Sequence, residues 1–173
     1  MSAYLKLKEI FREASLSSDI AGILHWDMST MMPSKSRNQR AEQLAYLSKL
    51  SHDKISSNEV RDLIFDAKQE KLNPNDSYNL REMEREHKLT SSISSDLVQK
   101  ISKIAAKCEG EWQEARKNSN FSLIKNSLDE LINLTKEEAD ILGKEFNLSP
   151  YEALVNKFEP GSNTQLIANV FDD

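Results

Sequence analysis

The chain has 173 residues, which is long enough for one domain with a hydrophobic core and too short to indicate two. Its 23 Lys and Arg are interspersed with 28 Asp and Glu, and this balance excludes nucleic acid as an expected partner, because phosphate binding needs clustered basic residues. No apolar run approaches the roughly 18 residues that span a bilayer, so we expect no membrane partner. Cys108 is the only cysteine and the start lacks the apolar core of a signal peptide, which together predict a cytoplasmic protein.

The first element is a long amphipathic helix. With only four glycines and four prolines, the sequence favours long helices over strands. Apolar residues at steps of three and four predict a helix from Tyr4 to about Leu24, with a bend near Ser17 and Ser18. Pro33 cannot continue a helix that arrives from upstream, because it lacks the N–H group and its ring clashes with the preceding turn. The chain therefore turns at this proline.

The turn predicts the first specific contact between side chains. A second helix follows it, capped by Ser34 or Ser36, and continues to about residues 51–52. This helix carries Arg40 and Gln43 three residues apart, so they are neighbours on its surface. Asp27 lies before the turn and Arg40 after it. We therefore predict a charge-assisted clamp between these two side chains across the turn.

The remaining helices follow from the same periodicity and from the residues that can begin a helix. They are predicted to begin at Ser57 or Asn58, at Pro74, after a cap at Ser95 or Asp96, near Phe121, at Pro150 and after a cap at Thr164. The helix over residues 96–117 and the one that starts near Phe121 are separated by a short loop, so they should pack antiparallel as a hairpin. We predict an all-α fold, an antiparallel assembly of six or more helices in a single domain over residues 1–173.

Two short patterns could carry chemistry, but each favours a structural reading. His25 and Asp27 flank Trp26 and point to different faces of a helix, and no third ligand is close in sequence. Glu84 and His87 form an E-x-x-H pattern, yet a carboxylate metal site of that kind needs a second copy, which the chain lacks. We read Glu84 and His87 as part of a solvated, charged helix face.

Three further residues favour packing over chemistry. Trp26 and Trp112 are predicted core anchors, because large aromatic side chains dominate helix packing. Cys108 lies on the apolar stripe of its helix and is predicted to be a buried structural thiol. The chain contains neither a G-x-S-x-G nucleophile motif nor a Gly-rich phosphate loop. The residues alone therefore predict no catalytic and no metal-binding side chain.

Three separated blocks, in the right order, resemble signature segments of the M32 family of metallocarboxypeptidases, the carboxypeptidase Taq type. The second block matches W-x-x-A-R-x-x-x-x-F over residues 112–121, and the third is similar to P-Y-D-A-L and Y-E-P-G over residues 150–154 and 158–161. The first block is W-D-x-x-T-x-M-P followed by R-x-x-Q, and its residues here are Trp26, Asp27, Thr30, Met32, Pro33, Arg40 and Gln43. The resemblance spans nearly the whole chain, and we treat these seven residues as a structural motif.

The resemblance implies an enzyme whose metal site lies elsewhere. Family members are zinc-dependent exopeptidases, in which two His of an H-E-x-x-H helix and a downstream Glu hold the metal and the Glu of the motif is the general base. None of the three histidines here is followed by Glu. The resemblance therefore implies the N-terminal third of such a peptidase, without its zinc site, catalytic residues or peptide substrate.

The end of the sequence also reads as a truncation. Leu166, Ile167, Val170 and Phe171 form an apolar stripe with no further helix to cover it. We expect a fragment that is inactive alone. The alternative is a non-catalytic helical interaction module, which self-associates or docks a separately encoded catalytic part.

Overall fold

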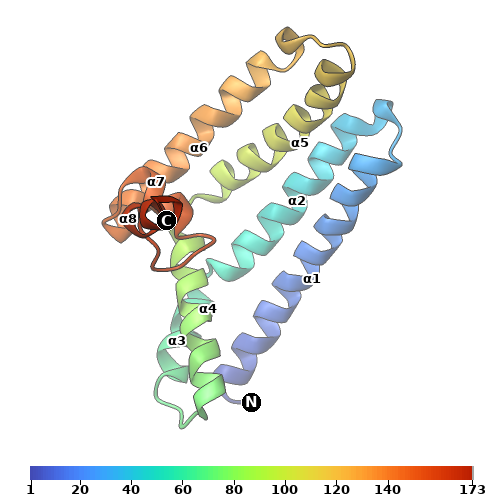
Figure 1. Cartoon of the computed structure of the whole chain (residues 1–173). Coiled ribbons are helices and arrows are strands. Elements are labelled where there is room, and N and C mark those ends of the chain that lie inside the picture. Colours follow the sequence, from blue (N-terminus) through green and yellow to red (C-terminus); the bar gives the residue numbers. More distant parts are fainter. Residues whose placement is uncertain (173) are drawn as a thin grey trace.

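The computed structural model describes residues 1–172, and in that part the chain is entirely helical, with no strand (Figure 1). The eight α-helices there are α1 (Ala3–Thr30), α2 (Arg37–Ile55), α3 (Asn58–Ala67), α4 (Pro74–Ser92), α5 (Ser95–Lys117), α6 (Lys125–Phe146), α7 (Pro150–Val155) and α8 (Thr164–Asp172). Two short 3-10 turns, Ser34–Ser36 and Phe121–Leu123, precede α2 and α6. The predicted all-α fold class is confirmed.

Several helices begin where the sequence predicts, because capping side chains satisfy their free N–H groups. The Ser57 side chain accepts a hydrogen bond from the Val60 N–H at the start of α3. Asn73 caps α4, and Pro74 occupies a first-turn position that needs no N–H donor. Ser149 caps α7 in a reciprocal capping box with Glu152.

Other boundaries differ from the prediction. The cap of α5 is Ser94 rather than Ser95, and the side chain of Asn163, rather than Thr164, accepts from the first turn of α8. Helix α1 is continuous through Ser17 and Ser18, and Figure 1 shows it without a kink. Both serine hydroxyls donate to carbonyl groups one turn earlier, so they are satisfied without breaking the helix.

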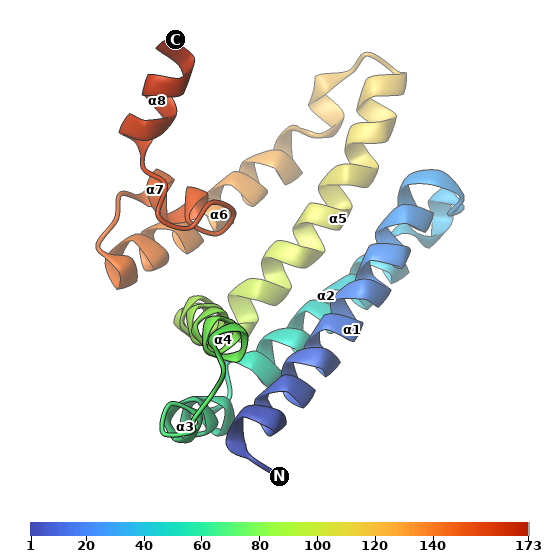
Figure 2. The ribbon, with the colours of Figure 1, turned by 60° about the horizontal axis from the view of Figure 1, so that its bottom comes forward.

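Four long helices run alternately up and down the molecule. Figure 1 shows α1 and α2 side by side and antiparallel, α5 along the other side of α2, and α6 returning along α5. The predicted hairpin of α5 and α6 is therefore formed. Helices α3 and α4 pack at the end of α1 that carries the N-terminus (Figure 2). No helix among residues 1–172 is both long and apolar enough to cross a membrane.

Most buried apolar side chains of the described residues fall into four clusters spaced along these helices. Leu7 belongs to a cluster of α1, α3 and α4, and Leu44 to one between α1, α2 and α5. Leu142 packs with residues of α5, α7 and the α4–α5 link, and Cys108 packs between α5 and α6. Cys108 is buried, as its position on the apolar stripe predicts.

The two tryptophans are not core residues, and that prediction is wrong. Trp26 is 63% exposed and Trp112 is 47% exposed. Helix α2 packs against the side of α1 that carries Met28, and two residues along a helix the side chain points to a different face. Trp112 instead lies under the guanidinium of Arg116, 5.6 Å from the ring centre.

Candidate functional site

Arg40 joins the end of α1 to the start of α2. Its Nη2 donates to Asp27 Oδ2 at 2.7 Å, its Nη1 to the Leu24 carbonyl at 2.5 Å, and its Nε to Gln43 Oε1 at 3.0 Å. The Arg40 side chain is only 13% exposed. The predicted clamp between Asp27 and Arg40 is present, and Gln43 completes it by orienting the guanidinium from the next turn of α2.

The other residues of the first block shape the same turn. The Thr30 hydroxyl donates to the Trp26 carbonyl at 2.7 Å, and the N–H of Met32 reaches the Asp27 carbonyl at 2.8 Å. Met32 is half-buried against the Met28 cluster, and Pro33 begins the 3-10 turn. The block thus closes α1 and starts α2.

The structure separates the two members of the His25–Asp27 pair. His25 Nδ1 lies 4.0 Å from Glu109 Oε2 on α5, while Asp27 is bound by Arg40. The Ser29 hydroxyl donates to the other Glu109 oxygen at 2.7 Å. Glu109 therefore links α5 to the C-terminal end of α1. His25 and Asp27 contact different partners, so they form neither a metal site nor an acid–base pair.

The two residues of the E-x-x-H pattern on α4 also have different partners. Glu84 pairs with Lys68 at 2.5 Å, as expected of a charged surface. His87, in contrast, is half-buried, and its Nδ1 lies 2.7 Å from the carbonyl of Ile55, the last residue of α2. A carbonyl only accepts, so Nδ1–H donates and satisfies a free group at the helix end. The solvated-face interpretation is wrong for His87.

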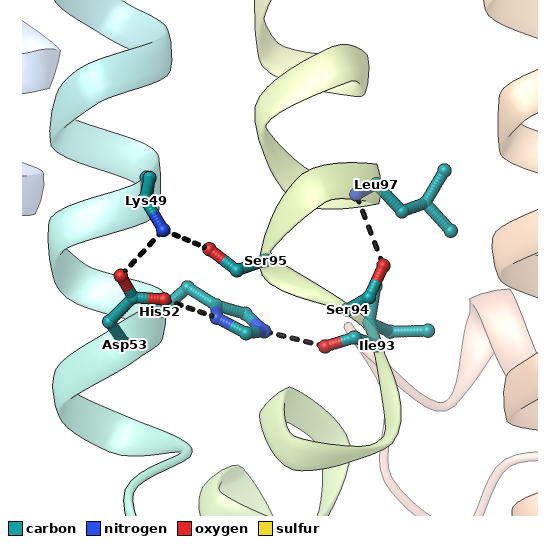
Figure 3. Close-up of polar contacts among 7 residues, drawn as sticks. All are labelled: Lys49, His52, Asp53, Ile93, Ser94, Ser95 and Leu97. Carbon is teal, nitrogen blue, oxygen red and sulfur yellow. Dashed lines mark hydrogen bonds and ion pairs between the residues drawn. The ribbon is translucent and has the colours of Figure 1, made fainter.

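A polar network that the sequence pattern does not predict surrounds His52 (Figure 3). His52 is buried, and its Nε2 lies 2.6 Å from the carbonyl of Ile93 in the link between α4 and α5. Lys49 donates to Asp53 Oδ2 and to the Ser95 hydroxyl, both at 2.8 Å. The hydrogen bond from Lys49 holds the pKa of Asp53 below its usual value. The network ties α2 to the beginning of α5.

The position of His52 in the helical repeat could have predicted that its side chain is buried. It lies eight residues after Leu44 on the same face of α2, where buried residues recur. The sequence pattern predicts an end of this helix near residues 51–52, whereas α2 continues to Ile55 and includes His52. A histidine on an apolar face needs a buried acceptor, and the Ile93 carbonyl is that acceptor.

A pocket of about 390 Å³ opens beside this network, between α2, α4, α5 and α6. Its lining includes the apolar residues Val98 and Leu142 and the polar residues Ser48 and Thr90. Ser48 donates to Ser102 at 2.9 Å, so its hydroxyl is already used between α2 and α5. No described contact pairs a serine hydroxyl with His52 here, whose ring nitrogens lie near Asp53 and the Ile93 carbonyl.

Residues 1–172 do not fit a zinc site. No three His, Cys, Asp or Glu side chains in this part of the chain come together in a group that could hold a metal ion. His25 lies near Glu109, and His52 and His87 are bound to backbone carbonyls on different elements. We therefore derive no catalytic step through zinc from these residues.

The comparisons with known proteins decide the family. The model of the carboxypeptidase Taq (M32) metallopeptidases matches residues 6–173. The chain belongs to this family. The resemblance of the three sequence blocks is thereby confirmed.

Relatives within the M32 family are much longer than this chain. Thermostable carboxypeptidase 1 of Pyrococcus furiosus is 28% identical over 87% of the chain, and thermostable carboxypeptidase 1 of Thermus thermophilus is 26% identical over 98%. The solved metallocarboxypeptidase 1 of Trypanosoma cruzi superposes on 98% of the chain with a TM-score of 0.77 and 30% identity. The chain covers 30%, 36% and 34% of these proteins, so it spans about a third of their length.

Proposed function

We propose that this chain is the N-terminal third of a zinc metallocarboxypeptidase, which hydrolyses the last peptide bond of a polypeptide, and that the chain is inactive alone. The observation that carries the proposal is the match of residues 6–173 to the M32 family together with coverage of about a third of its relatives. The order of the three sequence blocks supports the N-terminal position. In the family the metal motif lies beyond them.

In this proposal the long helices contribute shape rather than reacting groups. Helices α1, α2, α5 and α6 would form part of the wall and lid of the substrate cleft. Zinc, held by the other part of the enzyme, would supply an activated water. The clamp of Asp27 and Arg40 would keep the α1–α2 hairpin rigid while peptide binds, because it fixes the turn from both helices.

A peptidase assay tests the proposal. The purified chain is incubated with a peptide that has a free C-terminal carboxylate, with added zinc or with a chelator, and release of the last residue is measured. Carboxypeptidase 1 of Bacillus subtilis, a relative 27% identical over 94% of the chain, is the positive control. We expect no cleavage by the chain. Chelator-sensitive cleavage would contradict the proposed inactivity.

A second candidate is a non-catalytic helical module that self-associates or docks a separately encoded catalytic part. Large apolar side chains on the outer face of α1 favour it, since Ile20, Ile23 and Trp26 are 50%, 65% and 63% exposed. Exposed apolar patches of this kind mark association surfaces. Light scattering over a range of concentrations distinguishes self-association from a monomer that binds a different partner.

The proposed location is the cytoplasm. Cys108 is the only cysteine and it is buried, so the chain makes no use of an oxidising compartment. Expression of the full-length coding sequence with a C-terminal tag, followed by fractionation, tests this part of the proposal. Recovery in a secreted or membrane fraction would contradict it.

A further inference from the structure

A second pocket, of about 660 Å³, lies between the beginning of α2 and the middle of α5, and Figure 1 shows these two helices side by side. Its volume falls in the usual range of small-molecule sites. The charged side chains of its lining are four cations and two anions, namely Lys35, Arg37, Lys103, Lys107, Glu42 and Glu111. The lining is therefore positive in a chain whose net charge is −5. We call it the basic pocket.

Two lysines of α5 lie close together in the lining of the basic pocket. Lys103 and Lys107 are four residues apart, so their like charges are neighbours on the helix surface and repel each other. Lys103 pairs with Glu42, but Lys107 Nζ lies 3.8 Å from Glu111 Oε1, which is longer than a charged hydrogen bond of about 2.7–2.9 Å. The Lys107 ammonium therefore keeps N–H donors for a ligand. An anion between the two lysines would relieve their repulsion.

Arg37, from the α2 side of the pocket, lies against a glycine of α5. A Cβ atom on Gly110 would lie 2.8 Å from Arg37 Cδ and 3.0 Å from its Nε, so the arginine stem rests on bare backbone. The Arg37 side chain is 26% exposed, and its Nη2 donates to Glu114 Oε1 at 3.4 Å. A guanidinium has five N–H donors in a fixed plane, and this long contact engages one of them. The glycine thus holds a half-buried guanidinium that has donors left for a ligand.

We propose that the basic pocket binds a small anion with two or more negative charges, such as a phosphate ester or a polycarboxylate. The planar fork of Arg37 matches the oxygen pair of a phosphate or carboxylate group, whereas Lys35, Lys103 and Lys107 act as point charges. Because these cations come from two helices, a ligand that meets both sides needs more than one charged group. All lining residues lie between positions 34 and 111, so the inference goes beyond the proposed function and does not depend on it.

A titration followed by amide NMR tests the proposal. The ¹⁵N-labelled 173-residue chain is titrated with inorganic pyrophosphate, with citrate, and with sodium chloride at the same ionic strength. We expect saturable shifts at residues 34–38 and 103–111 with at least one of the two polyanions and not with chloride. Tighter binding of pyrophosphate assigns the site to phosphate compounds, and tighter binding of citrate assigns it to polycarboxylates. Shifts that do not saturate, or that chloride reproduces, overturn the proposal.

One pair of glycine variants tests the position of Arg37. Gly110→Ala pushes the Arg37 stem away from α5 and should weaken binding of the preferred anion about threefold or more. The atoms that must move belong to a flexible side chain, so the thermal unfolding midpoint should not fall. Gly22→Ala is the matched control, because a Cβ on this glycine of α1 meets nothing within 4 Å and should leave binding unchanged.

One pair of lysine variants tests whether binding needs the pocket or only the charge of the protein. Lys107→Gln should weaken binding about threefold, since it removes one of the four cations of the lining. Lys6→Gln removes the same charge from an exposed position near the start of α1 and should have no effect. Equal weakening by the two lysine variants overturns the proposal, because the anion would then respond to net charge alone. Unchanged binding by both Lys107→Gln and Gly110→Ala also overturns it.

Discussion

The guanidinium of Arg40 has three acceptors, of which only Asp27 is charged. In Asp27→Ala, Arg40 keeps two neutral acceptors and loses its ionic partner at a site where its side chain is mostly shielded from water. We expect the free energy of unfolding to fall by about 1–2 kcal/mol, measured by urea denaturation.

The control for this prediction is Asp62→Ala. Arg61 and Asp62 form an ion pair whose side chains are 63% and 68% exposed, so its loss should change the free energy of unfolding by less than about 0.5 kcal/mol. Identical unfolding curves for Asp27→Ala and the unchanged chain would contradict the clamp.

The carboxylate of Asp53 predicts a pH dependence. Its folded-state pKa is lowered, chiefly by the hydrogen bond from Lys49, so its ionised form stabilises the fold above the unfolded-state pKa of about 3.9. This contribution is lost as the pH falls through the folded-state pKa. Asp53→Asn should therefore destabilise the protein at pH 7, by less than about 1 kcal/mol because the carboxylate is half-exposed. Melting temperatures of both proteins should converge as the pH falls below the unfolded-state pKa of about 3.9. A constant difference would exclude the mechanism.

At the scale of residues, the sequence predicts best where two charges must meet across a forced turn. The pair of Asp27 and Arg40 was predictable because Pro33 fixes the turn between them. The network of His52 was not predictable, because the acceptor for the His52 ring is the backbone carbonyl of Ile93, which lies in the distant link between α4 and α5. Trp26 shows the same limit, since its exposure depends on which side of α1 faces α2.

Two glycines inside helices differ in the space around them, which is crowded at Gly143 and open at Gly22. A Cβ atom on Gly143 of α6 would lie 2.9 Å from the backbone carbonyl oxygen of Leu148, in the tight turn to α7, where Asn147 has a φ of 53°. Gly143→Ala should therefore destabilise the protein by about 1–3 kcal/mol, because backbone atoms must move. A Cβ on Gly22 of α1 meets nothing within 4 Å. Gly22→Ala should stabilise the protein by about 0.5–1 kcal/mol, since alanine restricts the unfolded chain.

Urea denaturation of the two variants is compared under the same conditions. Changes of opposite sign in the free energy of unfolding are expected. A neutral or stabilising Gly143→Ala would mean that the α6–α7 turn is looser than its geometry indicates.

At the scale of elements, caps and prolines predicted where most helices begin, because these signals are local. Asn73 with Pro74 and Ser149 with Pro150 each satisfy the free N–H groups of the helix that they begin. The errors at the starts of α5 and α8 are one residue each, where neighbouring Ser, Thr or Asn side chains compete for the same cap.

At the scale of the whole molecule, the sequence predicted antiparallel helices but not that their buried side chains form separate clusters. Short loops make consecutive helices neighbours, which accounts for the α1–α2 and α5–α6 hairpins. The contact of α2 with α5, which are separated by two other helices, depends on long-range packing. Such packing leaves no local pattern in the sequence, so the four separate clusters were not predicted.

Separate clusters predict that a core defect acts locally. Leu142 is 1% exposed in the cluster that joins α6 and α7 to α5, and Leu44 is 1% exposed in the cluster between α1, α2 and α5. Each leucine-to-alanine change should cost about 2–4 kcal/mol, from lost burial and the cavity left behind. In hydrogen exchange, Leu142→Ala should speed exchange in α6 and α7 and leave α1 nearly unchanged, while Leu44→Ala should do the reverse. If both variants speed exchange equally in all helices, the molecule opens as one unit, because the long helices transmit each defect from one cluster to the next.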